Sequence, residues 1–166
     1  NMGIKALSSN PVSFAGARVP AGNELGSEGS FDVGRMTNQG RVALGSLAVG
    51  VAKAAYEFAR DYAKERTAFG VPIAQKQAVA FILADMAIEV DAARLLLWEA
   101  AAKLDKGGDA TREAFLAKRY AAAACLKITD DAVQVLGGHG YIRDFPVELW
   151  LRNARGFSSF EGLALV

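Results

Sequence analysis

The chain has 166 residues, a length that fits a single domain. Hydrophobic residues make up 52% of it, which favours a folded protein with a sizeable core over a disordered one. Its 19 basic and 18 acidic residues nearly cancel, so the basic excess that phosphate contacts require is missing, and we expect no nucleic-acid partner.

The counts of cysteine and histidine and the lengths of the apolar runs exclude further classes of protein. One cysteine permits no internal disulfide, and with a single histidine it argues against a zinc site, so we expect no metal. No apolar run approaches the roughly 20 residues of a membrane span, and the N-terminus lacks a signal-peptide pattern. The sequence therefore predicts a cytoplasmic protein without a membrane partner.

Residues 1–30 differ in composition and hydrophobic pattern from the rest of the chain. The stretch from Val12 to Phe14 alternates with period two, and glycine, serine, asparagine and proline surround it, a pattern typical of a strand or two joined by turns. So few residues do not make a stable sheet alone. We interpret residues 1–30 as the edge of a separate domain and residues 31–166 as a domain of their own.

From about Phe31 onward, apolar residues recur at helical spacing and predict three long helices. The three apolar stripes run from Leu44 to Tyr62, from Val79 to Leu104 and from Leu116 to Val135. Gly137 and Gly138 stop the third helix, and Pro146 opens a shorter one. Because short loops make neighbouring helices antiparallel, the predicted fold is all-α: an up-down four-helix-type bundle with a short N-terminal β or extended segment.

Two residues with reactive side chains receive structural interpretations. A bundle with a di-iron centre needs Glu-x-x-His pairs, and His139 is the only histidine. His139 lies in a glycine-rich stretch and is interpreted as a loop residue, not as a base. Cys125 lies mid-helix among alanines, and its simplest interpretation is a small core residue.

Glu161 lies among apolar neighbours, namely Phe157, Phe160, Leu163 and Leu165. A carboxylate in such surroundings would be desolvated, a setting suited to proton abstraction. From these residues alone, an ordinary glutamate in a surface loop is the alternative interpretation.

Three motifs follow one another along the chain. Residues 66–70 read R-T-A-F-G, residues 134–141 read Q-V-L-G-G-H-G-Y, and residues 152–162 carry R-N-A, six further residues and E-G. They resemble the R-x-x-F-G, Q-x-x-G-G-x-G-Y and R-N-A-x6-E-G elements of the acyl-CoA dehydrogenase family. Residues 2–26 resemble the end of that family's middle β-domain, so the resemblance covers essentially the whole chain.

The resemblance implies an architecture and a set of partners. The family has an N-terminal helical domain, a middle β-domain and a C-terminal four-helix bundle that packs into dimers and tetramers. The chain resembles the last strands of the middle domain plus the C-terminal bundle. The resemblance therefore implies FAD as cofactor, an acyl-CoA as substrate, a homo-oligomer (dimer or tetramer) and an electron-transfer flavoprotein as electron acceptor.

The resemblance also implies roles at the substrate. Glu161 matches the catalytic base, which removes the α-proton of the acyl thioester while the flavin accepts the β-hydride. Arg41 matches an arginine near the acyl-CoA site, with Asn38 one turn before it and Gly162 directly after the base. Some members carry the base on the first long helix instead, at the position of Gly40, so Glu161 is the remaining candidate here.

Roles at the cofactor follow from the first motif. Arg66 matches the arginine that reaches the FAD pyrophosphate of a neighbouring subunit, and its guanidinium fork suits paired phosphate oxygens. Read alone, this arginine would only offset the dipole at a helix C-terminus. Phe69 matches an aromatic residue that packs by the cofactor, and Gln77 matches a glutamine near the adenosine end.

The second motif implies the remaining cofactor contacts. Gln134, Gly137 and Gly138 match the segment whose backbone lies against the ADP portion, where missing side chains permit a close approach. The chain departs from the family at Leu163, which replaces a threonine that contacts FAD in many members.

Two other functions stay open. An oxidase that reduces oxygen would keep the same fold and change only the electron acceptor. A helical oligomerisation module without chemistry would also fit the bundle. If the chain is a fragment of a dehydrogenase, we expect it to be inactive alone and to hold FAD weakly or not at all.

Overall fold

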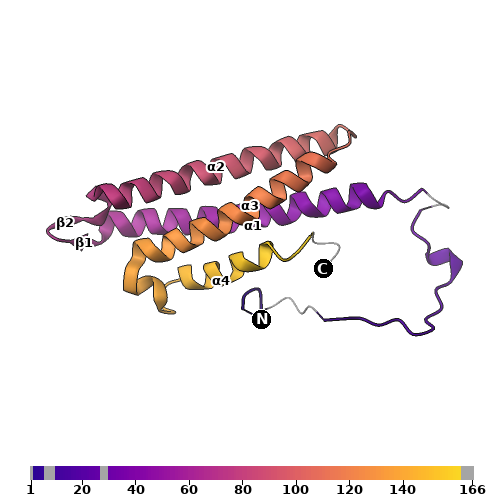
Figure 1. The fold of residues 1–166 in the computed structure, drawn as a ribbon, viewed down its shortest axis with the longest axis horizontal. Coiled ribbons are helices and arrows are strands. Elements are labelled where there is room, and N and C mark those ends of the chain that lie inside the picture. The colour runs from indigo at the N-terminus through magenta and orange to yellow at the C-terminus, as the bar shows by residue number, and fades with distance from the viewer. Residues whose placement is uncertain (1, 6–9, 27–29, 162–166) are drawn as a thin grey trace.

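The computed structural model describes residues 2–5, 10–26 and 30–161. Its four α-helices run alternately up and down, as can be followed in Figure 1. The helices are α1 (Val33–Glu65), α2 (Gln77–Asp105), α3 (Thr111–Leu136) and α4 (Val147–Phe157). The connections contain strands β1 (Thr67–Ala68) and β2 (Val71–Pro72) and the 3-10 turns η1 (Ala21–Asn23), η2 (Ile73–Gln75) and η3 (Gly137–Tyr141). The all-α, up-down four-helix-type bundle expected from the sequence is therefore confirmed.

Local signals explain where the helices begin and end. The side chain of Asp32 caps α1 by accepting a hydrogen bond of 2.7 Å from the backbone N–H of Arg35. The helix α2 is followed by Gly107 at φ 73°, and α3 is closed by Gly137 at φ 57°. Both glycines adopt the positive φ that favours glycine at a helix C-terminus.

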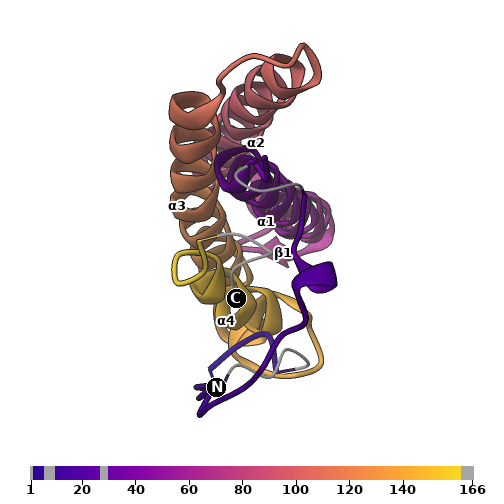
Figure 2. The ribbon, with the colours of Figure 1, turned by 90° about the vertical axis from the view of Figure 1, so that its right-hand side faces the viewer.

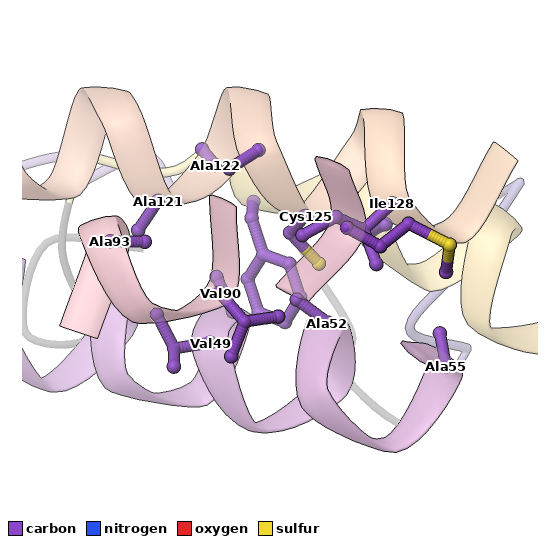
Figure 3. Packing of buried hydrophobic residues seen from close by; sticks show 14 of the residues in the cluster. Val49, Ala52, Ala55, Val90, Ala93, Ala121, Ala122, Cys125 and Ile128 are labelled. Atoms are coloured by element: carbon purple, nitrogen blue, oxygen red, sulfur yellow. The ribbon is translucent and has the colours of Figure 1, made fainter. Parts of the chain in front are cut away.

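The core between α1, α2 and α3 is lined mainly by small side chains. Figure 3 shows alanines and valines of the three helices meeting around Cys125 and Ile128. On α1, the buried face is an alanine stripe at positions 48, 52, 55, 59 and 63. The stripe predicted from larger residues was therefore partly wrong, because Leu47 is 52% exposed. Small residues let helix axes approach closely, which places the alanines of α1 inside together with Leu44 and leaves Leu47 outside.

The position of α1 is central in the bundle. Figure 2 shows α1 next to both α2 and α3, with α4 beside the end of α3. By length and composition alone, α1 could cross a membrane, so the expectation that no run reaches this length was wrong. Packing against the three other helices accounts for its apolar composition, as for any core helix of a bundle.

The N-terminal segment contains no strand among its described residues 2–5 and 10–26. The strand predicted around Val12 and Phe14 is thus not formed, and both side chains are exposed. A strand needs a neighbour for its backbone hydrogen bonds, and no other described strand lies beside this segment. The segment is extended, with the short turn η1 as its single element.

Residues 2–5 do make contact with the bundle, at α4. The backbone N–H of Ile4 donates to Oδ1 of Asn153 at 2.7 Å. Glycines permit this close contact, since a Cβ on Gly3 would lie 1.9 Å from the carbonyl oxygen of Arg152, and a Cβ on Gly156 would lie 2.6 Å from Cδ1 of Ile4. The segment before the bundle is therefore anchored to the helix that precedes Glu161.

Candidate functional site

The predicted base and the predicted substrate-binding arginine meet near the start of α1. The Nε of Arg41 donates to Oε1 of Glu161 at 2.6 Å, and a terminal nitrogen of the same guanidinium also donates to Oε1. Arg41 lies on α1, and Glu161 lies in the segment after α4. The fold thus brings together two residues that are 120 positions apart.

Asn38 holds the arginine of this pair. Its Nδ2 donates to Oγ1 of Thr111 at 2.9 Å, and its Oδ1 accepts a hydrogen bond of 3.3 Å from Nη1 of Arg41. The guanidinium also lies 5.4 Å from the ring centroid of Phe115, a cation–π distance. Asn38 itself is buried. The guanidinium is therefore fixed from α1 and α3 before it reaches Glu161.

The surroundings of Glu161 differ from the expected apolar ones. The carboxylate is 44% exposed, and Nζ of Lys118 lies 3.8 Å from Oε2, on the side away from Arg41. Phe157 is buried in the core and Phe160 packs against it, so these rings stabilise the bundle. The expectation of an apolar site was wrong, because the tertiary fold turns the carboxylate toward two cations that are far away in the sequence.

Gly40 and Gly162 are the sequence neighbours of Arg41 and Glu161. Gly40 is buried on α1 and offers no carboxylate, so no second base stands beside Arg41 at that position. Gly162, predicted to contact substrate, lies outside the described residues, as do Leu163 and Leu165.

The predicted cofactor-binding residues lie at the opposite end of α1. There β1 and β2 form a hairpin in which Thr67 faces Pro72 and Ala68 faces Val71. Its two-residue turn consists of Phe69 at φ 55° and Gly70 at φ 81°, the pattern of a type I′ turn. The sequence indicated only a turn here, because Phe-Gly is not a typical hairpin pair and Ala68 and Pro72 have low strand propensity.

Phe69 combines two unfavourable features. It is 95% exposed, and it is a bulky residue in the left-handed backbone region. The Nζ of Lys76 lies 5.7 Å from the ring centroid, which leaves most of the ring uncovered. Strain and exposure at one residue point to a contact outside this chain.

Arg66 borders a shallow pocket of about 280 Å³ that also includes Gly137, Gly138 and His139. The backbone N–H of Arg66 closes the last turn of α1 on the carbonyl of Tyr62 at 2.8 Å. The hydroxyl of Tyr62 makes a hydrogen bond of 2.8 Å with Nδ1 of His139, whose ring stacks on Phe145. His139 is thus a structural residue of η3, in agreement with its sequence interpretation.

The glycines of this segment have different reasons to be glycine. A Cβ on Gly140 would lie 2.5 Å from the carbonyl oxygen of Val133, so packing requires glycine there. Around Gly138 no other atom lies within 4 Å of the Cβ position, and its φ is not in the positive range. The fold therefore does not require glycine at 138, and the bare backbone there leaves room for a ligand.

Gln77 and Gln134 lie at the same end of the bundle as the pocket. Gln77 is the first residue of α2, and Gln134 is in the last turn of α3. Both are exposed, and neither lines the pocket. The structure thus gathers all the predicted cofactor-binding residues at one end of the bundle without joining the two glutamines to the pocket itself.

The two groups of site residues are far apart within one chain. Arg41 and Arg66 are both on or next to α1, and 25 residues of helix at 1.5 Å each place them about 37 Å apart. Among the described residues, no cluster of His, Cys, Asp and Glu could hold a metal ion. The arrangement offers a carboxylate base at one end and an arginine–glycine pocket at the other.

Sequence reasoning missed Lys118, Phe115 and Tyr62. A signal existed for Lys118, because it interrupts a run of small residues at the core-facing positions 114, 117, 121 and 125 of α3. The roles of Phe115 and Tyr62 depend on partners in other elements of the fold, so the local sequence pattern does not predict them.

Comparison with known proteins fits the motifs and the geometry. The sequence profile described as "Acyl-CoA dehydrogenase, C-terminal domain" matches residues 29–164. The chain belongs to the acyl-CoA dehydrogenase family. It is 42% identical to an acyl-CoA dehydrogenase of Bacillus subtilis over 163 residues, which are 97% of this chain and 43% of that protein. It is 40% identical over 167 residues to the caffeyl-CoA reductase-Etf complex subunit CarC of Acetobacterium woodii, covering 99% of this chain and 44% of that protein.

Solved structures of acyl-CoA dehydrogenases include the same bundle. Butyryl-CoA dehydrogenase from Megasphaera elsdenii superimposes with a TM-score of 0.82 at 40% identity, over 87% of this chain and 38% of that one. The chain thus spans less than half the length of these relatives. The activity of a whole acyl-CoA dehydrogenase is therefore a matter for proposal.

Proposed function

We propose that the chain forms the C-terminal part of an enzyme that dehydrogenates an acyl-CoA thioester between its α and β carbons with FAD as cofactor. The observation that carries this proposal is the network in which Asn38 and Arg41 hold Glu161. Family membership supports the reaction type, since the relatives from Bacillus subtilis and Megasphaera elsdenii are acyl-CoA dehydrogenases.

Glu161 is the proton acceptor in this proposal. Its Oε1 is occupied by both hydrogen bonds from Arg41. Its Oε2 lies 3.8 Å from Lys118, which is an ion-pair distance but too long for a hydrogen bond. Among the described residues no donor bonds to Oε2, so its lone pairs can take the α-proton, and general base catalysis of this kind contributes about 10²–10⁴-fold.

The residues at the other end of the bundle fit a dinucleotide phosphate. Arg66 supplies an exposed guanidinium, and the open backbone at Gly137 and Gly138 lines the same pocket. An arginine fork is a suitable partner for phosphate oxygens, and the missing side chains of the two glycines permit a close approach to their backbone. Phe69 would add an aromatic face, and Gln77 and Gln134 would add amides at the adenosine end. FAD, when bound, supplies the hydride acceptor for the β-carbon.

The separation of about 37 Å between the two groups supports a homo-oligomer. The cofactor end of one copy would then serve a neighbouring copy. Exposed apolar residues along α2 provide a surface for such assembly as a dimer or tetramer; they are Phe81, Ile88, Leu95 and Trp98. Patches of this kind rarely stay bare on a soluble monomer.

For the electron acceptor we propose an electron-transfer flavoprotein, and for the location the cytoplasm. The name of CarC places that relative in a complex with Etf, which supports such a partner here. The location rests on the sequence composition alone.

Anaerobic titration of the complete flavoenzyme with acyl-CoAs of increasing chain length tests the proposal. Bleaching of the flavin absorbance by at least one acyl-CoA, with none by free CoA, is the expected result. An enzyme that holds FAD and is bleached by no acyl-CoA would contradict the proposed reaction.

A further inference from the structure

Lys118 is the only lysine in the described part of the chain that is buried, with 8% of its surface exposed. It lies in the second turn of α3, on the face that packs against α1. An ammonium group withdrawn from water costs free energy unless an opposite charge compensates it. Lys118 has one such partner among the described carboxylates, and that partner is Glu161.

The contact between α1 and α3 explains how the lysine is buried. A Cβ on Gly45 of α1 would lie 3.5 Å from Cα of Lys118 and 2.6 Å from Cδ2 of Leu97. The backbones therefore approach closely at Gly45, and the lysine stem is enclosed there. Its Nζ lies 3.8 Å from Oε2 of Glu161.

The contacts of Glu161 divide between its two oxygens. Both hydrogen bonds from Arg41 end on Oε1, so Arg41 makes no hydrogen bond to Oε2. Lys118 is the one described partner of Oε2. At 3.8 Å it attracts this oxygen by charge without occupying a lone pair.

We propose that Lys118 is a positioning residue for Glu161, an inference that rests on the proposed function. Its charge holds the Oε2 edge of the carboxylate in place, as Arg41 holds Oε1, and leaves a lone pair of Oε2 for the α-proton. The buried stem holds the charge in one place, which a flexible surface lysine does not do. Substrate binding itself does not depend on Lys118 in this account.

Stopped-flow reduction of the flavin by butyryl-CoA tests the proposal in the complete holoenzyme. Lys118→Met keeps the buried stem and removes the charge, so we expect the limiting rate to fall at least about tenfold, because small misplacements of catalytic groups are costly. The apparent Kd for butyryl-CoA should change by less than about threefold, since this is lost transition-state stabilisation and not lost binding. Lys118→Arg, which restores the charge, should recover most of the rate.

The matched control is Lys127→Met on the same helix. Lys127 is exposed and pairs with Asp131 at 2.7 Å, so its loss should leave the rate unchanged. A Lys118→Met enzyme that is reduced at the wild-type rate would overturn the proposal. So would a Lys118→Arg enzyme as slow as Lys118→Met. A wild-type enzyme that no acyl-CoA reduces would instead contradict the proposed function. In that case, melting temperatures still test the contact between Lys118 and Glu161.

The wild type, Lys118→Met, Glu161→Gln and the double variant form a double-mutant cycle. Their melting temperatures test the contact between the two side chains without a measurement of activity. Glu161→Gln leaves the buried ammonium without a carboxylate, so it should lower the melting temperature more in the presence of Lys118 than in its absence. The double variant should therefore melt above Glu161→Gln alone. Strictly additive shifts would overturn the contact. A parallel cycle with Lys118→Gln serves if the methionine variant does not fold.

Discussion

The guanidinium of Arg41 and the carboxylate of Glu161 form an ion pair across 120 residues of sequence. The pair joins the first third of α1 to the segment that follows α4. A partly exposed ion pair contributes little to folding stability. Its value is geometric: the position of the proposed base depends on the register of the whole bundle and not on its own loop.

The first prediction concerns the base. Glu161→Gln keeps an oxygen that accepts from Arg41 but removes the group that takes a proton. We expect the rate of flavin reduction in the complete enzyme to fall at least about a hundredfold. FAD content and acyl-CoA affinity should be retained, as measured by absorbance and by equilibrium titration.

A control for this variant lies on α1. Glu57 is half-buried and pairs with Lys53 at 3.7 Å, so Glu57→Gln makes the same chemical change away from the site. Its rate should equal that of the wild type. If Glu161→Gln is reduced as fast as Glu57→Gln, another group is the base.

The second prediction separates two glycines of one segment. Gly140→Ala forces a Cβ against the carbonyl of Val133 and should lower the melting temperature by several degrees. Gly138→Ala meets no atom of its own chain, so the melting temperature of the apoprotein should stay unchanged. If the backbone at Gly138 lies against the cofactor, only this variant should lose FAD affinity without losing stability.

Differential scanning calorimetry of the apoproteins and flavin titration of each variant provide the two measurements. Equal FAD affinity in Gly138→Ala and the wild type would remove Gly138 from the proposed site. A stable Gly140→Ala protein would show that the packing around Val133 adjusts.

The sequence predicted the fold class better than the details of the core. Helical spacing and the glycines at 137 and 138 were sufficient for the number and order of helices. The buried alanine stripe of α1 was not predicted, because alanine is only weakly hydrophobic. Leu47 is strongly hydrophobic and is nevertheless exposed. The distance between packed helices decides which of these residues are buried, and this distance depends on α1, α2 and α3 together.

The same limit applies to the candidate site. Arg41, Asn38 and Glu161 were found from their motif positions, and the structure brings them together. The apolar neighbours of Glu161 in sequence were misleading, because Phe157 and Phe160 pack in the core while the carboxylate meets Arg41 and Lys118. Contacts between residues more than a hundred positions apart leave no periodic pattern to read.

The third prediction concerns the free thiol. Burial raises the pKa of Cys125 to about 12, because a thiolate would be poorly solvated in the core. Near pH 8 the thiol is therefore protonated and also shielded. A disulfide reagent such as dithionitrobenzoate, which reacts with the thiolate, should not label the native protein and should label it stoichiometrically in guanidinium chloride. Rapid stoichiometric labelling of the native protein would contradict the packing around Cys125.

The last prediction concerns assembly through α2. Phe81, Ile88 and Leu95 are spaced by seven residues, and Trp98 lies one turn further, so the four exposed side chains share one face of the helix. Burying this face against a second copy is favourable, whereas burying a charge there without a partner is costly. The double variant Ile88→Glu, Leu95→Glu should therefore sediment as a smaller species than the wild type at the same concentration, with unchanged helical circular dichroism. Leu149→Glu places a charge on an exposed leucine of α4 and serves as the control. Identical sedimentation of all three proteins would mean that subunits meet elsewhere, and the cofactor end of α1 would then need a different route to a neighbouring copy.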